Sequence, residues 1–209
     1  MIAVIDYGMG NLRSIGKALE RVGANVIVTN NPQRILDAEK IVLPGVGAFK
    51  DAMKNLEEMN LIPPILKSIK DGKPFLGICL GFQLLMTESE EFGIYKGFDI
   101  IKGKVVHFPS MNNGNKDSYP LKIPHMGWNT IHIEKGMPLL EDIEDNSFFY
   151  FVHSYYVVPD DKKVIAATTD YGITFTSGVE KDNIFAFQFH PEKSQEKGLK
   201  ILKKFLGIK

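Results

Sequence analysis

The chain has 209 residues, of which 44% are apolar, and its 25 basic side chains balance its 25 acidic ones. This length suits one globular domain, so we expect residues 1–209 to form a single domain. A net charge of zero argues against a nucleic-acid partner, because such proteins usually carry a basic surplus. No run approaches the roughly 18 apolar residues of a membrane span, and the start has no signal-peptide pattern, so we expect no membrane segment.

The first half alternates short apolar runs with helical patterns. Buried strands are predicted at Ile2–Ile5, Asn25–Val28, Ile41–Leu43 and Phe75–Ile78. Helices are predicted at Leu12–Val22, Ala48–Met59 and Leu61–Ile69, another begins in Leu80–Met86, and Asn30–Pro32 is typical of a turn. This alternation predicts an α/β, flavodoxin-like three-layer fold with a central, mostly parallel sheet flanked by helices.

The second half of the sequence consists mostly of strand-like runs. Strand-like runs are Val105–Phe108, Thr130–Ile133, Phe148–Val152, Val164–Thr168, Thr174–Val179 and Ile184–Phe189. We therefore expect additional antiparallel strands here. The polar stretch Ser110–Tyr119 predicts a surface loop. Ser194 is a candidate N-cap for a final helix that has Leu199, Leu202 and Leu206 on one face.

Cys79 is the only cysteine, which excludes an intrachain disulfide and a Cys-x-x-Cys zinc site. A lone cysteine fits a reducing compartment, so we expect a cytoplasmic protein, and nothing in the sequence calls for a cofactor or a metal. Cys79 lies in Gly77-Ile-Cys79-Leu-Gly81, between a predicted strand and a predicted helix. Flanking glycines permit a sharp turn that presents the nucleophile, and the N–H groups of the helix start favour the thiolate. The alternative is a cysteine that serves as a small buried hydrophobe.

A cysteine nucleophile needs a base, and the histidines are His107, His125, His132, His153 and His190. His190 ends the strand Ile184–Phe189, within Gln188-Phe-His190-Pro-Glu192. Residues i and i+2 of an extended segment share a face, so the Glu192 carboxylate can reach the imidazole and set its tautomer. Taken alone, the same segment suits an ordinary turn at a strand end.

The turn Pro44-Gly45-Val46-Gly47 follows a strand and precedes a helix. Its backbone N–H groups can face a negative oxygen, although a routine loop has the same composition. It lacks the Lys-Ser/Thr ending of a phosphate-binding P-loop. The N-terminal Gly8-Met-Gly10-Asn-Leu-Arg13 has Arg13 in place of the third glycine of a dinucleotide fingerprint.

Together these segments resemble the class I, triad-type glutamine amidotransferases. Gly77-Ile-Cys-Leu-Gly-Phe-Gln83 matches the nucleophile motif of that family, and His190-Pro-Glu192 matches its histidine–glutamate motif. The segments that resemble the glutaminase subunits of imidazole glycerol phosphate synthase are Asp6–Leu12, Pro44–Gly47, Pro124–Asn129 and Tyr150–Tyr155. The resemblance covers the chain end to end. One departure is Met111–Tyr119, which is longer and more polar than the family pattern leads us to expect.

The resemblance implies a function for each matched residue. Cys79 attacks the side-chain amide of glutamine to form a thioester, His190 is the base and Glu192 orients it. The oxyanion is held by backbone N–H groups of Leu80 and of Val46 and Gly47. The residues implied for glutamine binding are Gln83, Glu91, Ser154 and Tyr155. Without the resemblance, Gln83 and Glu91 suit a helix surface, and Ser154 and Tyr155 suit a core strand.

The resemblance also implies a partner. This is the cyclase subunit, a (βα)8 barrel that forms a heterodimer with the glutaminase and receives its ammonia. It makes imidazole glycerol phosphate and aminoimidazole carboxamide ribotide in histidine biosynthesis. The residues implied to lie near that interface are Asn11, Trp128, Tyr150 and Lys193. The backbone at Gly45 and Val46 is a candidate switch, because glycine neighbours permit a peptide flip.

Three other functions stay open on the sequence. The nearest is a triad glutaminase that serves anthranilate, pyridoxal phosphate or guanylate synthesis. A second is a cysteine hydrolase without an ammonia acceptor, such as a γ-glutamyl peptidase. The third is a non-catalytic flavodoxin-like binding module, for which Cys79 would be dispensable.

Overall fold

The computed structural model describes residues 1–109 and 122–208, so the predicted loop Ser110–Tyr119 and the departure Met111–Tyr119 lie outside the described residues. The strands are β1 (Ile2–Ile5), β2 (Val26–Thr29), β3 (Lys40–Leu43), β4 (Phe75–Ile78), β5 (Met86–Ser89), β6 (Tyr95–Lys96), β7 (Ile101–His107), β8 (His125–Thr130), β9 (His132–Ile133), β10 (Phe148–His153), β11 (Tyr155–Pro159), β12 (Ile165–Asp170), β13 (Thr174–Lys181) and β14 (Ile184–Phe187). The helices are α1 (Leu12–Arg21), α2 (Pro32–Asp37), α3 (Phe49–Glu58), α4 (Ile62–Lys70), α5 (Leu80–Gln83) and α6 (Gln195–Gly207), with 3-10 turns η1 (Pro138–Leu140), η2 (Lys162–Val164) and η3 (Pro191–Lys193).

The central sheet has a parallel half and an antiparallel half. Strands β2, β1, β3, β4 and β14 lie side by side in that order, and every neighbouring pair is parallel. From β14 onward the sheet continues through β13 and β11 to β7 by antiparallel pairing. Strands β8 and β10 form a separate antiparallel pair. The predicted mostly parallel sheet with added antiparallel strands is therefore confirmed.

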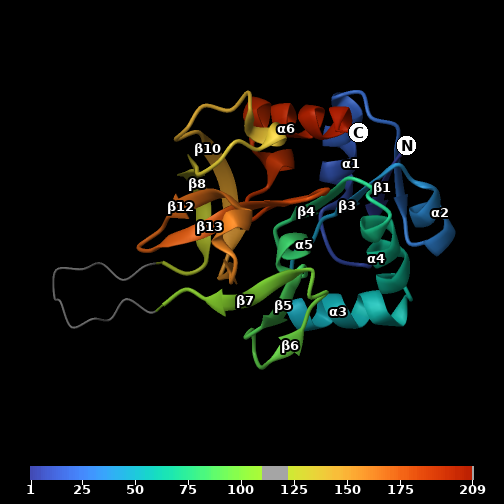
Figure 1. Cartoon of the computed structure of the whole chain (residues 1–209), viewed down its shortest axis with the longest axis horizontal. Coiled ribbons are helices and arrows are strands. Elements are labelled where there is room, and N and C mark those ends of the chain that lie inside the picture. Colours follow the sequence, from blue (N-terminus) through green and yellow to red (C-terminus); the bar gives the residue numbers. More distant parts are fainter. Residues whose placement is uncertain (110–121, 209) are drawn as a thin grey trace.

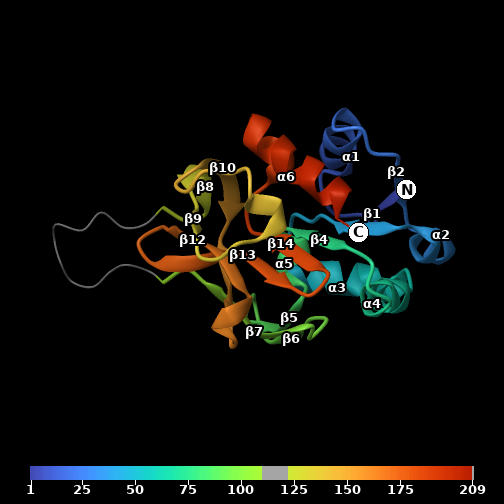
Figure 2. The ribbon, with the colours of Figure 1, turned by 45° about the horizontal axis from the view of Figure 1, so that its top comes forward.

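Helices cover both faces of the parallel half, which gives the predicted three layers (Figure 1 and Figure 2). Alternate residues of each strand point to opposite faces, as the pleat requires. Val4 and Val42 pack with residues of α1 and α6 on one face. Ala3 and Ile41 pack with residues of α2, α3 and α4 on the other. Two buried clusters therefore hold the sheet between its helical layers.

Several elements differ from the sequence prediction. The turn predicted at Asn30–Pro32 is the start of α2, where the Asn31 side chain accepts hydrogen bonds from Gln33 N at 2.9 Å and Arg34 N at 3.2 Å. Asn and Pro favour turns and helix starts alike, so composition alone did not separate the two. The helix expected over Leu80–Met86 stops at Gln83, because Met86 pairs with Ile101 and begins β5.

The carboxyl ends of three adjacent parallel strands converge at one edge of the sheet. In the register, Leu43 of β3 lies opposite Gly77, and Phe187 of β14 lies opposite Ile78. The residues that follow are the Pro44–Gly47 turn after β3, Cys79 after β4 and Gln188–His190 after β14. Ligands of open α/β sheets bind at such strand ends. The topology therefore gathers the segments with predicted chemistry.

Gly81 makes this arrangement possible, and we predict that it tolerates no side chain. A Cβ atom at Gly81 would overlap the Leu43 carbonyl of the neighbouring strand end. Gly81→Ala should lower the free energy of unfolding by about 3 kcal/mol or more, because the backbone of β3 must move. Gly16→Ala is the control, since its Cβ meets only Val28 at 3.8 Å inside α1. Urea unfolding should find that variant as stable as the parent chain; equal losses in both variants would contradict the prediction.

Candidate active site

Cys79 forms the strained corner between β4 and α5. Its φ of 53° and ψ of −106° place a non-glycine residue in a sparsely populated region. The sequence prediction assigned the unusual backbone conformation of this turn to the flanking glycines, but the residue that has it is Cys79 itself. Gly77 and Gly81 have no positive φ and instead provide room, because a Cβ on either one would collide with backbone. The backbone N–H of Cys79 donates to Phe187 O at 2.8 Å, which holds the corner against β14.

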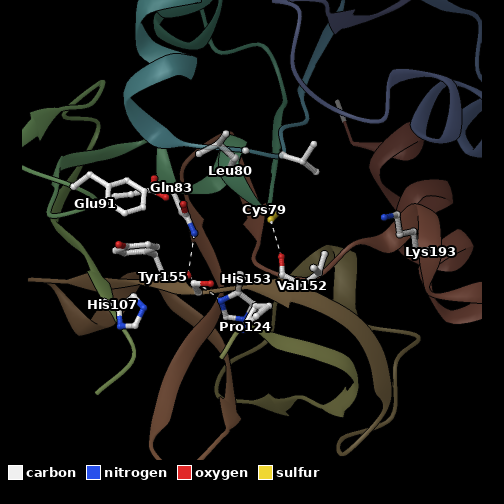
Figure 3. A pocket seen from close by; sticks show the side chains of 14 residues that line it. Cys79, Leu80, Gln83, Glu91, His107, Pro124, Val152, His153, Tyr155 and Lys193 are labelled. Carbon is white, nitrogen blue, oxygen red and sulfur yellow. Dashed lines mark hydrogen bonds between the residues drawn. The ribbon is translucent and has the colours of Figure 1, made fainter. Parts of the chain in front are cut away.

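The Cys79 sulfur is buried between two polar groups. It lies 3.9 Å from the Val152 carbonyl oxygen, to which the thiol can donate (Figure 3). The Gln188 side-chain amide also donates to the sulfur, at 3.6 Å. The helix that follows, α5, has only four residues, so its dipole is weaker than the sequence prediction assumed.

His190 and Glu192 form a buried pair beside the sulfur. The Nδ1 atom of His190 lies 2.8 Å from Oε1 of Glu192, and the two side chains are 2% and 4% exposed. The predicted contact between His190 and Glu192 is present, but the backbone that connects the two residues is not the extended segment that we predicted. Pro191–Lys193 is the 3-10 turn η3, and only His190 itself is extended. The carboxylate keeps the proton on Nδ1 and leaves Nε2 to accept one.

Charge around His190 favours its imidazolium form. Burial lowers the pKa of His190, but the Cys79 thiolate and the Glu192 carboxylate outweigh burial and raise it to about 10. Among the described residues, Nε2 of His190 has no hydrogen-bond partner within normal limits. The Cys79 sulfur and the His190 imidazole therefore interact electrostatically, and Nε2 is the ring nitrogen that carries the second proton of the imidazolium.

Ser194 fixes the backbone of His190 and does not cap α6 as predicted. It does precede the helix, but its side chain makes no capping hydrogen bond. Its hydroxyl donates to the His190 carbonyl at 2.7 Å and accepts from Tyr150 N at 3.0 Å. The His190 N–H in turn donates to Tyr150 O at 2.9 Å. Strand β10 therefore holds His190 in position.

The predicted oxyanion donors lie beside the sulfur, but one of them is already occupied. Val46, Gly47 and Leu80 line the same cavity as Cys79. The Leu80 N–H donates to the Gly45 carbonyl at 3.3 Å, so it does not face the cavity as a free donor. The buried Tyr7 hydroxyl donates to Pro44 O at 2.9 Å and holds the same turn. Burial, followed by the charge of Cys79, raises the pKa of Tyr7 far above its usual range, so this hydroxyl keeps its proton.

A cavity of about 560 Å³ opens over Cys79 (Figure 3). It is lined by the predicted substrate residues Gln83, Glu91, Ser154 and Tyr155 and by the predicted interface residue Lys193. Sequence reasoning missed five further lining residues, which are Phe92, His107, Pro124, Val152 and His153. His153 and Pro124 belong to segments that the family resemblance quoted without a role, whereas Phe92, on a turn, had no sequence signal.

Gln83 and Glu91 are not the helix-surface residues that their sequence context alone suggests. Gln83 is buried, and its Nε2 donates to Tyr155 O at 3.0 Å. Glu91 lies in the turn after β5, where its Oε2 accepts from Phe49 N at 2.6 Å and caps α3. Burial raises the pKa of Glu91, partly offset by this backbone N–H. Glu91 is also one of the residues that line the cavity.

Three of the four predicted interface residues form one cluster. The Trp128 and Tyr150 rings meet edge to face at 6.2 Å, and the Lys193 ammonium lies 5.6 Å from the Tyr150 ring centroid. Trp128 is 47% exposed, so it is not a core residue. Asn11 is separate: its side chain caps α1 by accepting from Ser14 N at 3.2 Å. Helix α1 does, however, lie against η3, which carries Lys193.

Two buried histidines connect the surface of β8 with the cavity. His125 Nδ1 lies 3.0 Å from His153 Nε2, and His153 Nδ1 lies 2.8 Å from the Tyr155 carbonyl oxygen. A carbonyl only accepts, so His153 carries its proton on Nδ1 and accepts from His125 at Nε2. Asn129 Nδ2 is 3.2 Å from the remaining nitrogen of His125. Both rings are therefore neutral in this arrangement.

Comparison with known proteins places the chain among glutamine amidotransferases. Residues 3–208 match the family described as Glutamine amidotransferase class-I. The imidazole glycerol phosphate synthase subunit HisH of Geobacter sulfurreducens is 56% identical, and the alignment covers 100% of this chain and 99% of that one. The subunit of the same name from Aquifex aeolicus is 54% identical over 97% of this chain and 94% of its own length.

Solved structures agree on the fold. A structure titled as a glutamine amidotransferase superposes with a TM-score of 0.73 at 15% identity and covers 100% of both chains. PurLQS from Thermotoga maritima superposes with a TM-score of 0.70 at 21% identity, covering 99% of this chain and 97% of that one. None of the helices in residues 1–109 and 122–208 is long and apolar enough to cross a bilayer.

The neutral histidine pair should make the fold sensitive to acid. Burial lowers the pKa of His125 from 6.5 to about 4, and burial with neighbouring charge lowers that of His153 to about 3. Between pH 6.5 and about 4 the unfolded chain therefore binds protons that the folded chain does not. We predict that the free energy of unfolding falls with acidification in this window, by at most about 1.4 kcal/mol per pH unit for each histidine.

Urea unfolding at several pH values checks this prediction. A double variant, His125→Gln with His153→Gln, should be less stable at pH 7 but lose less stability as the pH falls. The half-exposed His132, changed to Gln, is the control and should keep the slope of the parent chain. Parallel declines in the parent and the double variant would contradict the assignment.

Proposed function

This chain belongs to the class-I glutamine amidotransferase family, and we propose that it hydrolyses L-glutamine to glutamate and ammonia through Cys79, His190 and Glu192. One observation carries the proposal: a buried histidine–carboxylate pair lies beside a cysteine on a strained corner, and that cysteine opens into a cavity. We assign the activity to residues 1–209 as a single class I domain, in line with a family match that spans residues 3–208.

The first step of the proposed reaction forms a thioester. His190 takes the thiol proton at Nε2, and the sulfur attacks the side-chain amide carbon of glutamine. Collapse of the tetrahedral intermediate breaks the C–N bond, and the imidazolium gives its proton to the departing ammonia. Water then attacks the thioester with His190 again as base, which releases glutamate and restores the thiol. The Glu192 contact at 2.8 Å supports this assignment, because a carboxylate that accepts from Nδ1 leaves Nε2 as the nitrogen that takes the thiol proton and stabilises the imidazolium that forms.

Four residues of the cavity are proposed to bind the substrate. The free oxygen of Glu91 is suited to the α-ammonium group of glutamine, because the other oxygen is held by the α3 N-terminus. Gln83 and Tyr155 form one wall and are joined by a hydrogen bond of 3.0 Å. Ser154 lies beside Tyr155 on the same wall. A polar wall with one carboxylate suits an amino acid better than an apolar ligand.

The oxyanion hole is proposed to be closed in the isolated chain. The Gly45 carbonyl occupies the Leu80 N–H at 3.3 Å, so a substrate oxyanion lacks that donor. Rotation of the peptide unit between Gly45 and Val46 would free Leu80 and aim a second N–H, from Val46 or Gly47, at the cavity. Loss of one such donor costs roughly 10²–10³-fold in rate. Free glutaminase activity should therefore be low.

We propose that a cyclase subunit is the partner and that its binding activates the glutaminase. The relatives from Geobacter sulfurreducens and Aquifex aeolicus are named as subunits of imidazole glycerol phosphate synthase. We propose that this chain pairs, as a heterodimer, with a (βα)8-barrel cyclase that uses the ammonia to make imidazole glycerol phosphate and aminoimidazole carboxamide ribotide in histidine biosynthesis. Exposed Met126, Trp128 and Phe148 form an apolar surface next to Tyr150 and Lys193 that suits such an interface. Asn11 precedes α1, which packs against η3, so we assign Asn11 to the edge of this interface.

A glutaminase assay tests the proposed function. The purified chain should release glutamate slowly alone and at least about 100-fold faster with a cyclase subunit and its nucleotide ligand, because the oxyanion donors are then available. Glutamate release is measured in a coupled dehydrogenase reaction. Full activity without the partner would refute the closed oxyanion hole, and no stimulation by a cyclase would refute the pathway.

Cys79→Ala should abolish the stimulated activity, because no thioester can form. We expect a loss of roughly 10³-fold or more in kcat. Ser68→Ala is the matched control: this side chain is also buried, but it lies in α4 and does not line the cavity. Stimulated activity that survives in Cys79→Ala would refute the nucleophile.

A further inference from the structure

Gln188 is a buried polar residue that the proposed reaction does not use. It follows β14, two residues before His190, and its side chain is 0% exposed. Its backbone N–H donates to Ser177 O at 2.9 Å, which fixes its main chain against β13. A fully buried amide is costly unless its donor and acceptor groups are paired. Its partners are therefore informative about its role.

The orientation of the Gln188 amide follows from a backbone carbonyl. Tyr155 O can only accept, so the Gln83 atom at 3.0 Å from it is the NH2 nitrogen. The same nitrogen lies 3.2 Å from Gln188, and its second hydrogen requires an acceptor there, the Oε1 atom. The other end of the Gln188 amide, its NH2 group, consequently faces Cys79 Sγ at 3.6 Å. The direction of donation is set by the fold.

The two groups that contact the sulfur respond differently to its charge. Val152 O at 3.9 Å accepts the thiol proton but repels a thiolate. The Gln188 N–H tolerates a thiol and attracts a thiolate, since a donor bonded to the charged form favours that form. Ionisation of Cys79 therefore weakens the first contact and strengthens the second.

We propose that Gln188 stabilises the thiolate of Cys79 by direct donation and that Gln83 holds its amide in the donating orientation. The chain of contacts runs from Tyr155 O through Gln83 and Gln188 to the sulfur. Gln188 thereby assists the nucleophile as the donor to the sulfur, whereas Val152 O is an acceptor. This inference rests on Cys79 being the nucleophile of the proposed function, but its test does not require glutamine turnover.

Cys79 is the only cysteine of the chain, so alkylation by iodoacetamide reports on it alone. The rate is measured against pH for the full chain and for Gln188→Met, which keeps the length of the side chain and removes the donor. The pH at half the limiting rate should rise by about one unit in the variant, the size expected for a hydrogen bond to an ionised group. An unchanged midpoint in a variant that unfolds at the parent's temperature overturns the proposal.

Ser177→Ala is the matched control, because Ser177 is equally buried and next to Gln188 but does not touch the sulfur. Its alkylation midpoint should equal that of the parent, and a shift as large as that of Gln188→Met overturns direct donation. If Gln188→Met does not fold, nuclear magnetic resonance of the parent chain decides. In the parent chain, the chemical shifts of the Gln188 side-chain N–H groups should change with pH around the alkylation midpoint, and in Cys79→Ser they should not change there. Chemical shifts that do not change with pH in the parent chain overturn the proposal.

Discussion

The parallel pairing of β4 with β3 on one side and β14 on the other fixes the geometry on which the rest of the site depends. Because Leu43 lies opposite Gly77 and Phe187 opposite Ile78, the three strands end at one level of the sheet. The turn at Gly45, the corner at Cys79 and the pair at His190 are consequently neighbours in space, although more than a hundred residues of sequence lie between Cys79 and His190. The two helical layers bury this register on both faces, so a shift of any one strand would disrupt a core cluster.

Much of this arrangement was predictable from the sequence, because local signals and strand ends coincide. The strands of the parallel half and the contact between His190 and Glu192 follow from periodicity and from the His-Pro-Glu spacing. The occupied Leu80 N–H was not predictable, since it depends on where the Gly45 carbonyl points after folding. The same limit applies to Glu91, whose carboxylate caps a helix 42 residues away, and to Gln188, whose side-chain partners are Gln83 of α5 and the Cys79 sulfur.

The buried histidines near the site differ in the direction in which their pKa is shifted. His125 and His153 are buried without a carboxylate, so their rings stay neutral and pass hydrogen bonds in one direction toward Tyr155. His190 is buried with Glu192 and beside Cys79, so its imidazolium is favoured. Burial is common to all three, and the neighbouring charges decide which ring can exchange a proton. Of the three, only His190 follows β14 and interacts with both Cys79 and Glu192.

The central claim is that Cys79 is the nucleophile for a glutamine side chain bound in the adjacent cavity. The direct measurement is mass spectrometry of the chain, in complex with a cyclase subunit, after treatment with an electrophilic glutamine analogue. We expect one adduct, on Cys79, which excess glutamine prevents and which forms much more slowly in His190→Asn. An adduct elsewhere, or labelling of Cys79 that glutamine does not affect, would contradict it.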